Sequence, residues 1–342
     1  MSIVVTGGAG FIGRHLVTRL CESRAAFGVT DEPLVVLDNL RRGSREALAS
    51  LVTQGQVRFV EGDIRDAATL AEVMRGATYV FHLAAQANVM GAEDDPDYAF
   101  TTNVEGTYRV VQAAAHAGAR RVVFTSSREV YGQPVSLPVA EDAQLAPKNG
   151  YGASKAAGEM LCRMAASRGG LEMVTLRLAN VYGPGDTGRV IPLWLECAER
   201  GEELLIYGGN QVLDFIWVGD AVDALLRAAL APRNLFAAAG ILPDEHVEPG
   251  FFVALNVGTG RGTAIRTLAE RVCEVTGHDV SIRVLPPRTA EVVRFVADIW
   301  LMRRTLGLRP ELPLACLPQL VHGPRKPRTA HRPQQTKLVT AS

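Results

Sequence analysis

The sequence predicts an α/β fold: a doubly wound parallel sheet with a second, smaller α/β domain attached. In the first half of the chain, short apolar runs that end in polar or small residues alternate with helix-like segments, as in βαβ units joined by right-handed crossovers. A glycine-rich turn directly follows the first apolar run. After Asn180 the alternation loosens and Gly and Pro become frequent, which indicates a smaller domain at the carboxyl ends of the strands.

Each expected strand is a run rich in Val, Leu and Phe, the composition of strands that are buried on both faces. In chain order the runs are "SIVVTG", "LVVLDN", "VRFVEGD", "YVFHLAA", "RVVFTSS" and "LEMVTLRLAN". Helices are expected over 11–22, 67–75, 103–117 and 151–168. We assign 1–178 to the first domain, to which 212–232 and 252–258 return, and 179–320 to the second. The basic, Pro-rich segment 321–342 is expected to be a disordered tail.

Composition excludes several classes of protein. Of the 342 residues 47% are hydrophobic, and Lys+Arg and Asp+Glu both total 36, so no net field favours nucleic acid or an anionic membrane as a partner. The start "MSIVVTGG" is not a signal peptide, and no apolar run approaches the roughly 20 residues of a membrane helix. The five cysteines are dispersed without CxxC spacing, which argues against a disulfide framework or a metal site. We therefore expect a cytoplasmic protein without a metal.

The turn "TGGAGFIG" predicts a dinucleotide site. Gly7, Gly10 and Gly13 stand between the first strand and the first helix. Glycines there permit a tight turn, a close approach of the backbone to a pyrophosphate and close helix–strand packing, while the helix N-terminus offers N–H groups to the phosphates. The pattern is informative because a strand precedes it and an amphipathic helix follows it.

Aspartates at the ends of the second and third strands extend this site. Asp38, in "LVVLDNL", can accept hydrogen bonds from the adenosine ribose hydroxyls and would repel a 2′-phosphate, which favours NAD over NADP. Arg41 and Arg42 follow closely and leave NADP as the alternative. Asp63, in "EGDIRD", either reaches the adenine or caps the next helix.

The segment "YGASK" places Tyr151 and Lys155 four residues apart, on one face of a helix. A free tyrosine has a pKa near 10, so its use as a base near neutrality requires a pKa that is lower by roughly three. A lysine ammonium and an oxidised, positively charged nicotinamide beside the phenol would favour the phenolate. Together with the glycine turn and Asp38, the pair predicts acid–base chemistry at a dinucleotide site.

Taken in order, the motifs resemble those of the extended short-chain dehydrogenases that act on nucleotide sugars. The resemblance runs over about residues 2–312 and rests on "TGGAGFIG", "LDNL", "GDI", "HLAAQ", "TNVEGT", "TSSREVYG", "YGASKAAGE", "RLANVYGPG", "DFIWVGDAV", "NVGTG" and "PPRTAEVVRFVAD". It implies an NAD-binding Rossmann domain and a nucleotide-sugar-binding domain. It also implies a 4-epimerase, which oxidises C4 transiently and then reduces the 4-keto sugar on its opposite face.

The resemblance also implies roles for individual residues. The catalytic residues would be Ser127, Tyr151 and Lys155, with Glu129 beside them. The cofactor would contact Gly7, Gly10, Phe11, Ile12, Gly13, Asp38, Asn39, Asp63, Ile64, Leu83, Ala84, Ala85, Asn103, Tyr151 and Lys155. The substrate would contact Ser127, Arg128, Asn180, Arg189, Arg288, Glu291 and Phe295. In this assignment Arg288 pairs with the diphosphate, Glu291 binds a ribose hydroxyl, and the bulky Phe295 favours a non-acetylated sugar.

The segment "SSREVYG" leaves alternatives open. A nucleotide-sugar 4,6-dehydratase needs a base for the C5 proton and an acid to expel water from C6, and in the family these are a glutamate and an aspartate side by side. Here Glu129 occupies the base position and Arg128 the acid position, and arginine is a poor proton donor. A decarboxylase acting on a glucuronic acid is a further alternative, because Arg128 could hold the carboxylate. An NAD-sensing regulator without turnover is the alternative from another class, although such proteins tend to lose the Tyr–Lys pair.

The family also implies a homodimer and a UDP-sugar as the default substrate, with dTDP, GDP, ADP and CDP sugars as alternatives. The dimer would form through 103–117 and 152–168, where the Ala-rich stretches "VVQAAAHAGA" and "SKAAGEMLCRMAA" permit close packing. The family often has an arginine before "DF", where this chain has Leu213. One diphosphate contact is therefore expected either to be missing or to come from Arg189 or Arg294.

Overall fold

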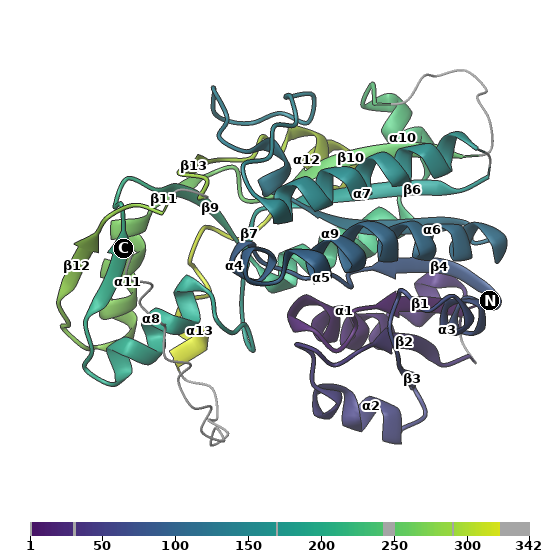
Figure 1. Cartoon of the computed structure of the whole chain (residues 1–342), viewed down its shortest axis with the longest axis horizontal. Coiled ribbons are helices and arrows are strands. Elements are labelled where there is room, and N and C mark those ends of the chain that lie inside the picture. Colours follow the sequence, from purple (N-terminus) through teal and green to yellow (C-terminus); the bar gives the residue numbers. More distant parts are fainter. Residues whose placement is uncertain (1, 30–31, 169, 242–249, 289–290, 322–342) are drawn as a thin grey trace, which may run out of the picture.

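The structure is a computed structural model, and it describes residues 2–29, 32–168, 170–241, 250–288 and 291–321. A larger, layered α/β part contains the N-terminal half of the chain, and a smaller part lies beside it (Figure 1). Most of the predicted basic tail, 322–342, lies outside the described residues.

A seven-stranded parallel sheet forms the centre of the larger part. Its strands are β1 (Ser2–Thr6), β2 (Leu34–Asp38), β3 (Val57–Glu61), β4 (Ala77–His82), β5 (Arg121–Ser127), β6 (Glu172–Leu178) and β10 (Phe251–Val257), in the order β10-β6-β5-β4-β1-β2-β3. The predicted doubly wound parallel sheet is confirmed. The chain reverses its direction of travel across the sheet between β1 and β4, and sheets of this kind bind ligands beside that reversal, at the carboxyl ends of the strands.

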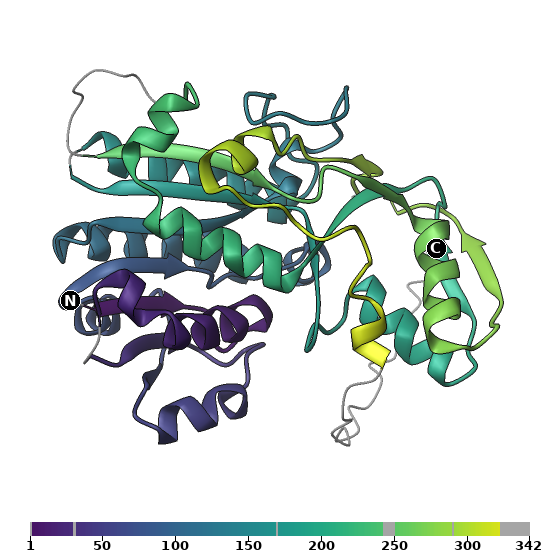
Figure 2. The same cartoon turned by 180° about the vertical axis from the view of Figure 1, so that it is seen from behind.

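Helices cover both faces of this sheet. On one face lie α1 (Phe11–Glu22) and α9 (Val218–Leu230), and on the other α3 (Ala67–Val73), α6 (Thr107–His116) and α7 (Gly150–Ser167). Figure 2 shows α1 and α9 on the near side of the strands. Ile3 and Val5 of β1 pack toward α1 and α9, whereas Val4 packs toward the other layer, as the period of two in a strand requires. Burial on both faces explains why the strands read as continuous apolar runs.

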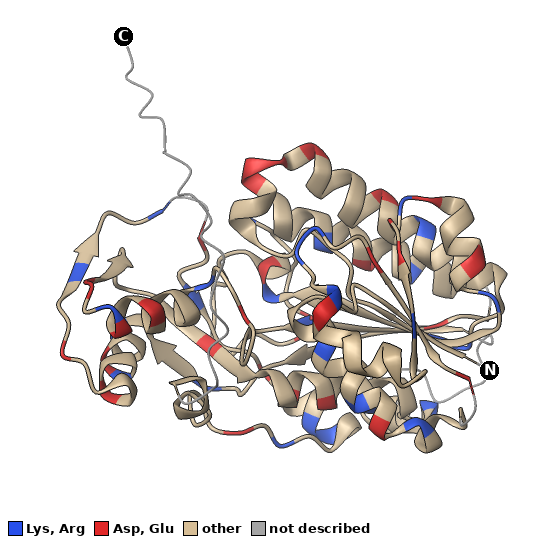
Figure 3. Ribbon diagram, turned by 90° about the horizontal axis from the view of Figure 1, so that it is seen from below, with Lys and Arg blue, Asp and Glu red and all other residues tan. Residues whose placement is uncertain are grey.

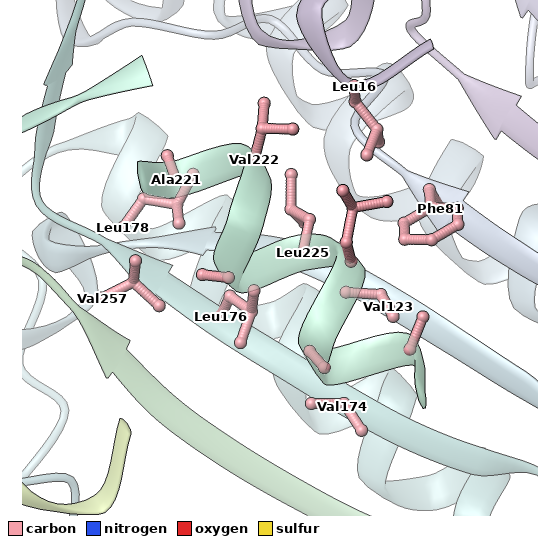
Figure 4. Close-up of a cluster of buried hydrophobic side chains, with 14 of the residues drawn as sticks. Leu16, Phe81, Val123, Val174, Leu176, Leu178, Ala221, Val222, Leu225 and Val257 are labelled. Atoms are coloured by element: carbon pink, nitrogen blue, oxygen red, sulfur yellow. The ribbon is translucent and has the colours of Figure 1, made fainter. Parts of the chain in front are cut away.

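Apolar side chains fill most of the core between α9 and the sheet, and at its edge the buried Arg121 of β5 donates to the carbonyl oxygens of Ala228 and Ala229. Val222 and Leu225 of α9 meet Leu16 of α1 and Val123 of β5 in this layer (Figure 4). The strand β9 (Val212–Trp217) leads into α9 without a loop. The packing of α9 on the large sheet therefore also positions β9, which belongs to the sheet that connects the larger part with the smaller one.

The shorter helices of the larger part are α2 (Ala49–Thr53), α4 (Val89–Asp94), α5 (Pro96–Phe100), α10 (Arg233–Ala238) and α12 (Trp300–Leu306). The predicted helix 103–117 differs from the observed one, because a π-helical turn over Thr101–Gly106 joins α5 to α6. Asp95 caps α5 through its side chain, with Pro96 at the first helical position, so local signals set this helix start.

The smaller part is built on a core of its own. It contains α8 (Val190–Glu199), α11 (Ile265–Thr276), α13 (Pro318–Val321) and the parallel pair β8 (Leu204–Tyr207) and β12 (Ile282–Leu285). A second sheet joins it to the larger part, in which β9 (Val212–Trp217) pairs parallel with β7 (Asn180–Tyr182) and β13 (Arg294–Phe295) and antiparallel with β11 (Gly262–Ala264). The sheet brings Asn180 close to the ends of the large-sheet strands.

Charges of both signs are interspersed over most of the described elements (Figure 3). Within the described ranges, no helix has both the length and the apolar composition to cross a membrane. All five cysteines are free thiols. The described part of the chain holds no group of His, Cys, Asp and Glu that could bind a metal ion.

Candidate active site

A cavity of about 500 Å³ opens at the carboxyl ends of the strands. Its wall comes from the turn after β1, the ends of β2, β4 and β5, the first turns of α1 and α7, and the segment 178–189. Eighteen of the predicted site residues line it: Gly7, Gly10, Phe11, Ile12, Gly13, Asp38, Asn39, Ile64, Leu83, Ala84, Ala85, Ser127, Arg128, Glu129, Tyr151, Lys155, Asn180 and Arg189. The structure therefore brings the glycine turn and the Tyr–Lys pair to one cavity.

The glycine turn packs closely on the end of β4 and on the first turn of α1. Gly7 has a φ of +74°, and a Cβ there would lie 2.6 Å from the backbone nitrogen of Ala84. A Cβ on Gly13 would overlap the carbonyl oxygen of Gly7. Gly10 is the N-cap of α1 and brings no side chain to cap it, so the N–H groups of the first turn can bind an anion. These features fit the pyrophosphate of a dinucleotide.

Asp38 is held at the end of β2 by two backbone donors. The N–H of Ala9 donates to Oδ2 at 2.9 Å, and the N–H of Leu40 donates to Oδ1 at 2.9 Å. Burial raises the pKa of Asp38, and these two hydrogen bonds oppose the shift. Each carboxylate oxygen has a second lone pair, so the oriented carboxylate can still accept a ribose hydroxyl.

Arg41, one of the two arginines that left NADP as the alternative, is engaged with the protein, whereas Arg42 is an exposed residue of the cavity wall. The guanidinium carbon of Arg41 lies 3.6 Å from the ring centroid of Tyr98, and Nη2 pairs with Asp95 at 2.9 Å. Burial lowers the pKa of Arg42, which lies within electrostatic reach of Asp186. With Arg41 engaged and the Asp38 carboxylate held where it would repel a 2′-phosphate, the cavity fits NAD.

Two predicted cofactor residues, Asp63 and Asn103, do not line the cavity. Both carboxylate oxygens of Asp63 accept from Arg65, at 2.9 and 2.8 Å, and this pairing lowers the pKa of Asp63. Asn103 is 1% exposed. Its Oδ1 accepts from the N–H of Gln86 at 2.8 Å, and its Nδ2 donates to Oγ of Ser154 at 2.9 Å. In this structure Asp63 and Asn103 bind other residues of the protein behind the cavity, whereas the sequence predicts that both contact the cofactor directly.

The helix α7 presents Tyr151 and Lys155 to the cavity. Asn149 caps α7 through its side chain, so Tyr151 stands in the first turn and Lys155 one turn later. Nζ of Lys155 donates to the carbonyl oxygen of Thr125 in β5 at 2.9 Å and lies 6.0 Å from the ring centroid of Tyr151. Ser127, the last residue of β5, lines the same end of the cavity.

Burial moves the pKa values of these two groups in opposite directions. It raises the pKa of Tyr151 to about 12, although the positive charge of Arg189 and the hydroxyl of Ser127 lower it. Burial also lowers the pKa of Lys155 to about 8. The sequence predicts a pKa of Tyr151 below its ordinary value, whereas the pKa in this structure lies above it. A further positive charge must therefore approach the phenol before it can act as a base.

Arg128 and Glu129 form an ion pair inside the cavity. Nη2 of Arg128 lies 2.8 Å from Oε1 of Glu129, with the side chains 11% and 8% exposed. Oε2 of Glu129 accepts from Nδ2 of Asn149 at 2.9 Å, and Nε of Arg128 donates to Oδ1 of Asn180 at 3.3 Å. Both oxygens of Glu129 are therefore engaged, which weakens it as a base for carbon chemistry.

Three predicted substrate residues lie away from this cavity. The guanidinium carbon of Arg288 is 3.8 Å from the ring centroid of Tyr207, and its Nη1 pairs with Glu291 at 3.3 Å. Phe295 is fully buried and stacks on Tyr131, with the ring centroids 6.0 Å apart. The structure thus gives Phe295 a core position where the sequence predicts contact with the sugar.

Sequence reasoning missed a charged cluster in the wall. Asp186 pairs with Nε of Arg189 at 3.4 Å, and Arg14 of α1 donates to the carbonyl oxygen of Gly185. The signal was present in "GPGDTGR", a Gly- and Pro-rich turn that carries charges. Asn149 was also missed, although an Asn before a helical pattern is an N-cap signal.

The chain is similar to known proteins over most of its length. Residues 3–238 match a family model described as the NAD dependent epimerase/dehydratase family. The chain is 37% identical to a UDP-glucose 4-epimerase of Mycolicibacterium smegmatis over 325 residues, which are 92% of this chain and 95% of that protein. The solved structure of UDP-glucose 4-epimerase from Thermotoga maritima with UDP-glucose is 32% identical, with a TM-score of 0.81, and covers 94% of this chain and 97% of that one. DesIV, a dTDP-glucose 4,6-dehydratase from Streptomyces venezuelae with NAD bound, is also 32% identical, with a TM-score of 0.81 over 94% and 96% of the two chains.

Proposed function

Because the chain belongs to the NAD dependent epimerase/dehydratase family, we propose that it is a nucleotide-sugar 4-epimerase that acts on UDP-hexoses. The observation that carries the proposal is the meeting of Ser127, Tyr151 and Lys155 in the cavity that the glycine turn also lines. A dinucleotide on the turn and a sugar beside the trio would share that cavity. The choice of UDP follows relatives that are UDP-glucose 4-epimerases.

The residues that would hold NAD come from four strand ends. The first-turn N–H groups of α1 would bind the pyrophosphate, Asp38 would accept the ribose hydroxyls, and Ile64 and Ala84 line the same cavity. When bound, NAD supplies the redox chemistry, oxidising C4 of the sugar and then reducing the 4-keto sugar on its other face. Lys155 uses one ammonium donor on the carbonyl oxygen of Thr125 and keeps two for a ligand.

Tyr151 would move the proton. Its phenolate takes the proton from the 4-hydroxyl during oxidation and returns it during reduction, while the Ser127 hydroxyl binds the same oxygen. Because burial raises the pKa of Tyr151 to about 12, proton removal depends on positive charge at the phenol. Arg189 and Arg128 supply such charge in this chain, the Lys155 ammonium lies 6.0 Å from the ring centroid, and the oxidised cofactor would add a further charge, so the phenol becomes basic when the site is loaded for oxidation.

The pair formed by Arg128 and Glu129 favours epimerisation over dehydration. A guanidinium cannot protonate a leaving hydroxyl, and both oxygens of Glu129 are engaged. Loss of CO2 from a uronic acid needs no acid residue at this position and is the alternative within the family. The regulator reading is disfavoured because Tyr151 and Lys155 are both present and face the cavity.

We further propose a homodimer formed through the layer that contains α6 and α7. Phe100 of α5, Tyr108 of α6 and Met160 of α7 are 56%, 44% and 65% exposed. Large apolar side chains exposed on neighbouring helices are typical of contact surfaces. Light scattering at micromolar concentration should give the mass of two chains, and the mass of one chain would contradict the proposal. A cytoplasmic location stays a prediction.

The test is a product spectrum. The protein is incubated with a panel of UDP-, dTDP-, GDP-, ADP- and CDP-sugars, and the sugars are followed by NMR. We expect interconversion of 4-epimers of a UDP-sugar. Tyr151→Phe should lower the rate by about 10²- to 10⁴-fold and leave the NAD content unchanged. A 4-keto-6-deoxy product would refute the epimerase assignment, and unchanged sugars with tightly bound NAD would indicate a regulator.

A further inference from the structure

The helix α7 carries a carboxylate one turn beyond its catalytic lysine. Glu159 follows Lys155 by four residues, so the two side chains leave the same face of the helix. Both residues are buried, each with 3% of its surface exposed. A buried carboxylate is costly unless it is paired and hydrogen-bonded. Because Glu159 is not among the residues that line the cavity, it can act on the reaction only through residues that do.

Two hydrogen bonds join this face of α7 to the end of β5. Nζ of Lys155 donates to the carbonyl oxygen of Thr125 at 2.9 Å. One helical turn later, Oε1 of Glu159 accepts from the hydroxyl of Ser126 at 2.5 Å. Thr125 and Ser126 directly precede Ser127, the last residue of β5. The two bonds therefore set the position of the catalytic serine relative to the catalytic lysine.

An arginine of β6 holds the Glu159 carboxylate in place. Nε of Arg177 donates to Oε1 at 3.0 Å, and Nη2 donates to Oε2 at 2.8 Å. Nη1 of the same guanidinium donates at 2.7 Å to the hydroxyl of Tyr131, which in turn donates to Oδ1 of Asn256 in β10 at 2.7 Å. Each of these four residues is at most 4% exposed. A buried network whose members are all hydrogen-bonded is rigid, so the carboxylate that holds Ser126 is itself preorganised.

The positive charge of Lys155 needs support, because the lysine is buried. Burial lowers the pKa of Lys155 to about 8, while Cys162 and Glu159 act in the opposite direction. The Cys162 thiol is neutral near pH 7, because burial raises its pKa. His82 of β4 is neutral as well, because burial lowers its pKa to about 3, and burial raises the pKa of the Tyr151 phenol to about 12. Among these groups Glu159 is the one that is negatively charged near pH 7.

We propose that Glu159 is a positioning residue of the catalytic site, which fixes the end of β5 through Ser126 and stabilises the ammonium of Lys155. The inference rests on the proposed function, because it concerns the residues that move the C4 proton there. Opposite charges four residues apart on a helix attract each other, and more strongly in a buried site of low dielectric. Arg177, the charged group that β6 brings to Glu159, is positive. Loss of the Glu159 charge would therefore leave two buried cations without their carboxylate.

Two variants separate the hydrogen bond from the charge. Ser126→Ala removes the donor and keeps the carboxylate. Its kcat for a UDP-sugar should fall about tenfold, the order expected when catalytic groups are displaced, while KM changes by less than about threefold. Glu159→Gln keeps an oxygen that can accept from Ser126 and removes the charge, so Lys155 should lose its proton at a lower pH. Ser126→Ala should leave that pH unchanged.

The protonation of Lys155 can be measured without turnover. The chain has four lysines, Lys148, Lys155, Lys326 and Lys337, so NMR of protein labelled with ¹³C at lysine Cε gives few signals, and Lys155→Arg identifies the one that matters. Parent and variants are compared at equal NAD content. In Glu159→Gln the midpoint of the Lys155 titration should lie lower by about one pH unit, the lower end of the range for the loss of a nearby opposite charge.

Glu172→Gln is the matched control, because it also removes one side of an ion pair with a buried arginine. Glu172 pairs with Arg121 at 2.6 Å, and these are the first residues of β6 and β5, at the ends of the strands away from the cavity. This variant should keep the parent kcat and the parent Lys155 midpoint.

The outcomes distinguish the inference from the proposed function. Equal Lys155 midpoints in the parent protein and Glu159→Gln, or an equal shift in Glu172→Gln, would overturn the inference. So would a Ser126→Ala variant with the parent kcat, which decides the matter if Glu159→Gln does not fold. A shifted midpoint in a protein that epimerises no sugar would instead overturn the proposed function and leave the contact between Glu159 and Lys155 standing.

Discussion

Lys155→Met should shift the pH dependence of epimerisation, not merely lower its rate. Nζ of Lys155 lies 6.0 Å from the ring centroid of Tyr151. At that separation and an effective dielectric of 20, two unit charges interact by about 3 kcal/mol, which corresponds to a change in pKa of about two. Loss of the ammonium should therefore raise the apparent pKa of the phenol by about two.

The same arithmetic shows how the phenol becomes a base. Burial raises the pKa of Tyr151 to about 12 in the protein alone, and Lys155 is not among the main causes of that value. Half ionisation near pH 7 requires a pKa lower by about five, or about 7 kcal/mol. Because Lys155 is already present in that protein, the lowering must come from charge that the loaded site adds, and one more unit charge at about 4 Å in the same dielectric supplies about 4 kcal/mol of it. The oxidised cofactor carries one such charge.

The assay is kcat/KM between pH 6 and 10 for the wild type, Lys155→Met and Lys155→Arg, with bound NAD measured in each preparation. The reaction requires the phenolate, so kcat/KM rises with pH up to the apparent pKa of the phenol and is level above it. On the rising limb Lys155→Met should be about 100-fold slower. The two curves should converge at alkaline pH, where the wild-type lysine, with its pKa lowered to about 8, loses its charge. Lys155→Arg should follow the wild type. A Lys155→Met curve that runs parallel to the wild type at equal NAD content would refute this reasoning.

Two further predictions concern cofactor binding and stability. Gly13→Ala places a methyl group against the Gly7 carbonyl oxygen and 2.7 Å from Cα of Gly8, so the turn must move. Bound NAD should then fall about tenfold or more, and a fully loaded variant would contradict this. Glu159→Gln removes one side of a buried pair, in which Nη2 of Arg177 lies 2.8 Å from Oε2 and the side chains are 5% and 3% exposed. For Glu159→Gln, the free energy of unfolding measured in urea should fall by about 3–5 kcal/mol. The matched change Glu72→Gln, at an exposed pair, should alter that free energy by less than about 1 kcal/mol. Equal losses in the two variants would count against the argument.

The features that local sequence decides were predicted correctly. The large sheet follows from apolar runs that must be buried on both faces, and the bends around Gly7 and Gly13 follow from glycines that no other residue can replace there. The start of α7 was predictable in the same way, because Asn149 caps it. Each of these signals lies within a few residues of the structure it specifies.

The features that depend on contacts between distant segments were not predicted. Phe295 occupies a motif position expected in the cavity wall, yet its ring is buried against Tyr131, a contact between β13 and the turn after β5. Asp63 is a local exception, because its carboxylate pairs with Arg65 two residues further on, and the sequence does not say which rotamers the two side chains adopt. The pKa of Tyr151 was expected to fall because sequence reasoning counts charges, whereas burial is the largest cause of its rise. How deeply a side chain is buried depends on the assembled cavity, so it cannot be predicted from the motif that contains the tyrosine.

Arg128 bears on the choice of reaction. Expulsion of water from C6 requires a hydroxyl on that carbon and an acid to protonate it, and a guanidinium cannot be that acid. The neighbouring Glu129 is held on both oxygens, by Nη2 of Arg128 at 2.8 Å and by Nδ2 of Asn149 at 2.9 Å, so the base of the dehydratase pattern is engaged as well. The residues at 128 and 129 therefore favour inversion at C4 over loss of water.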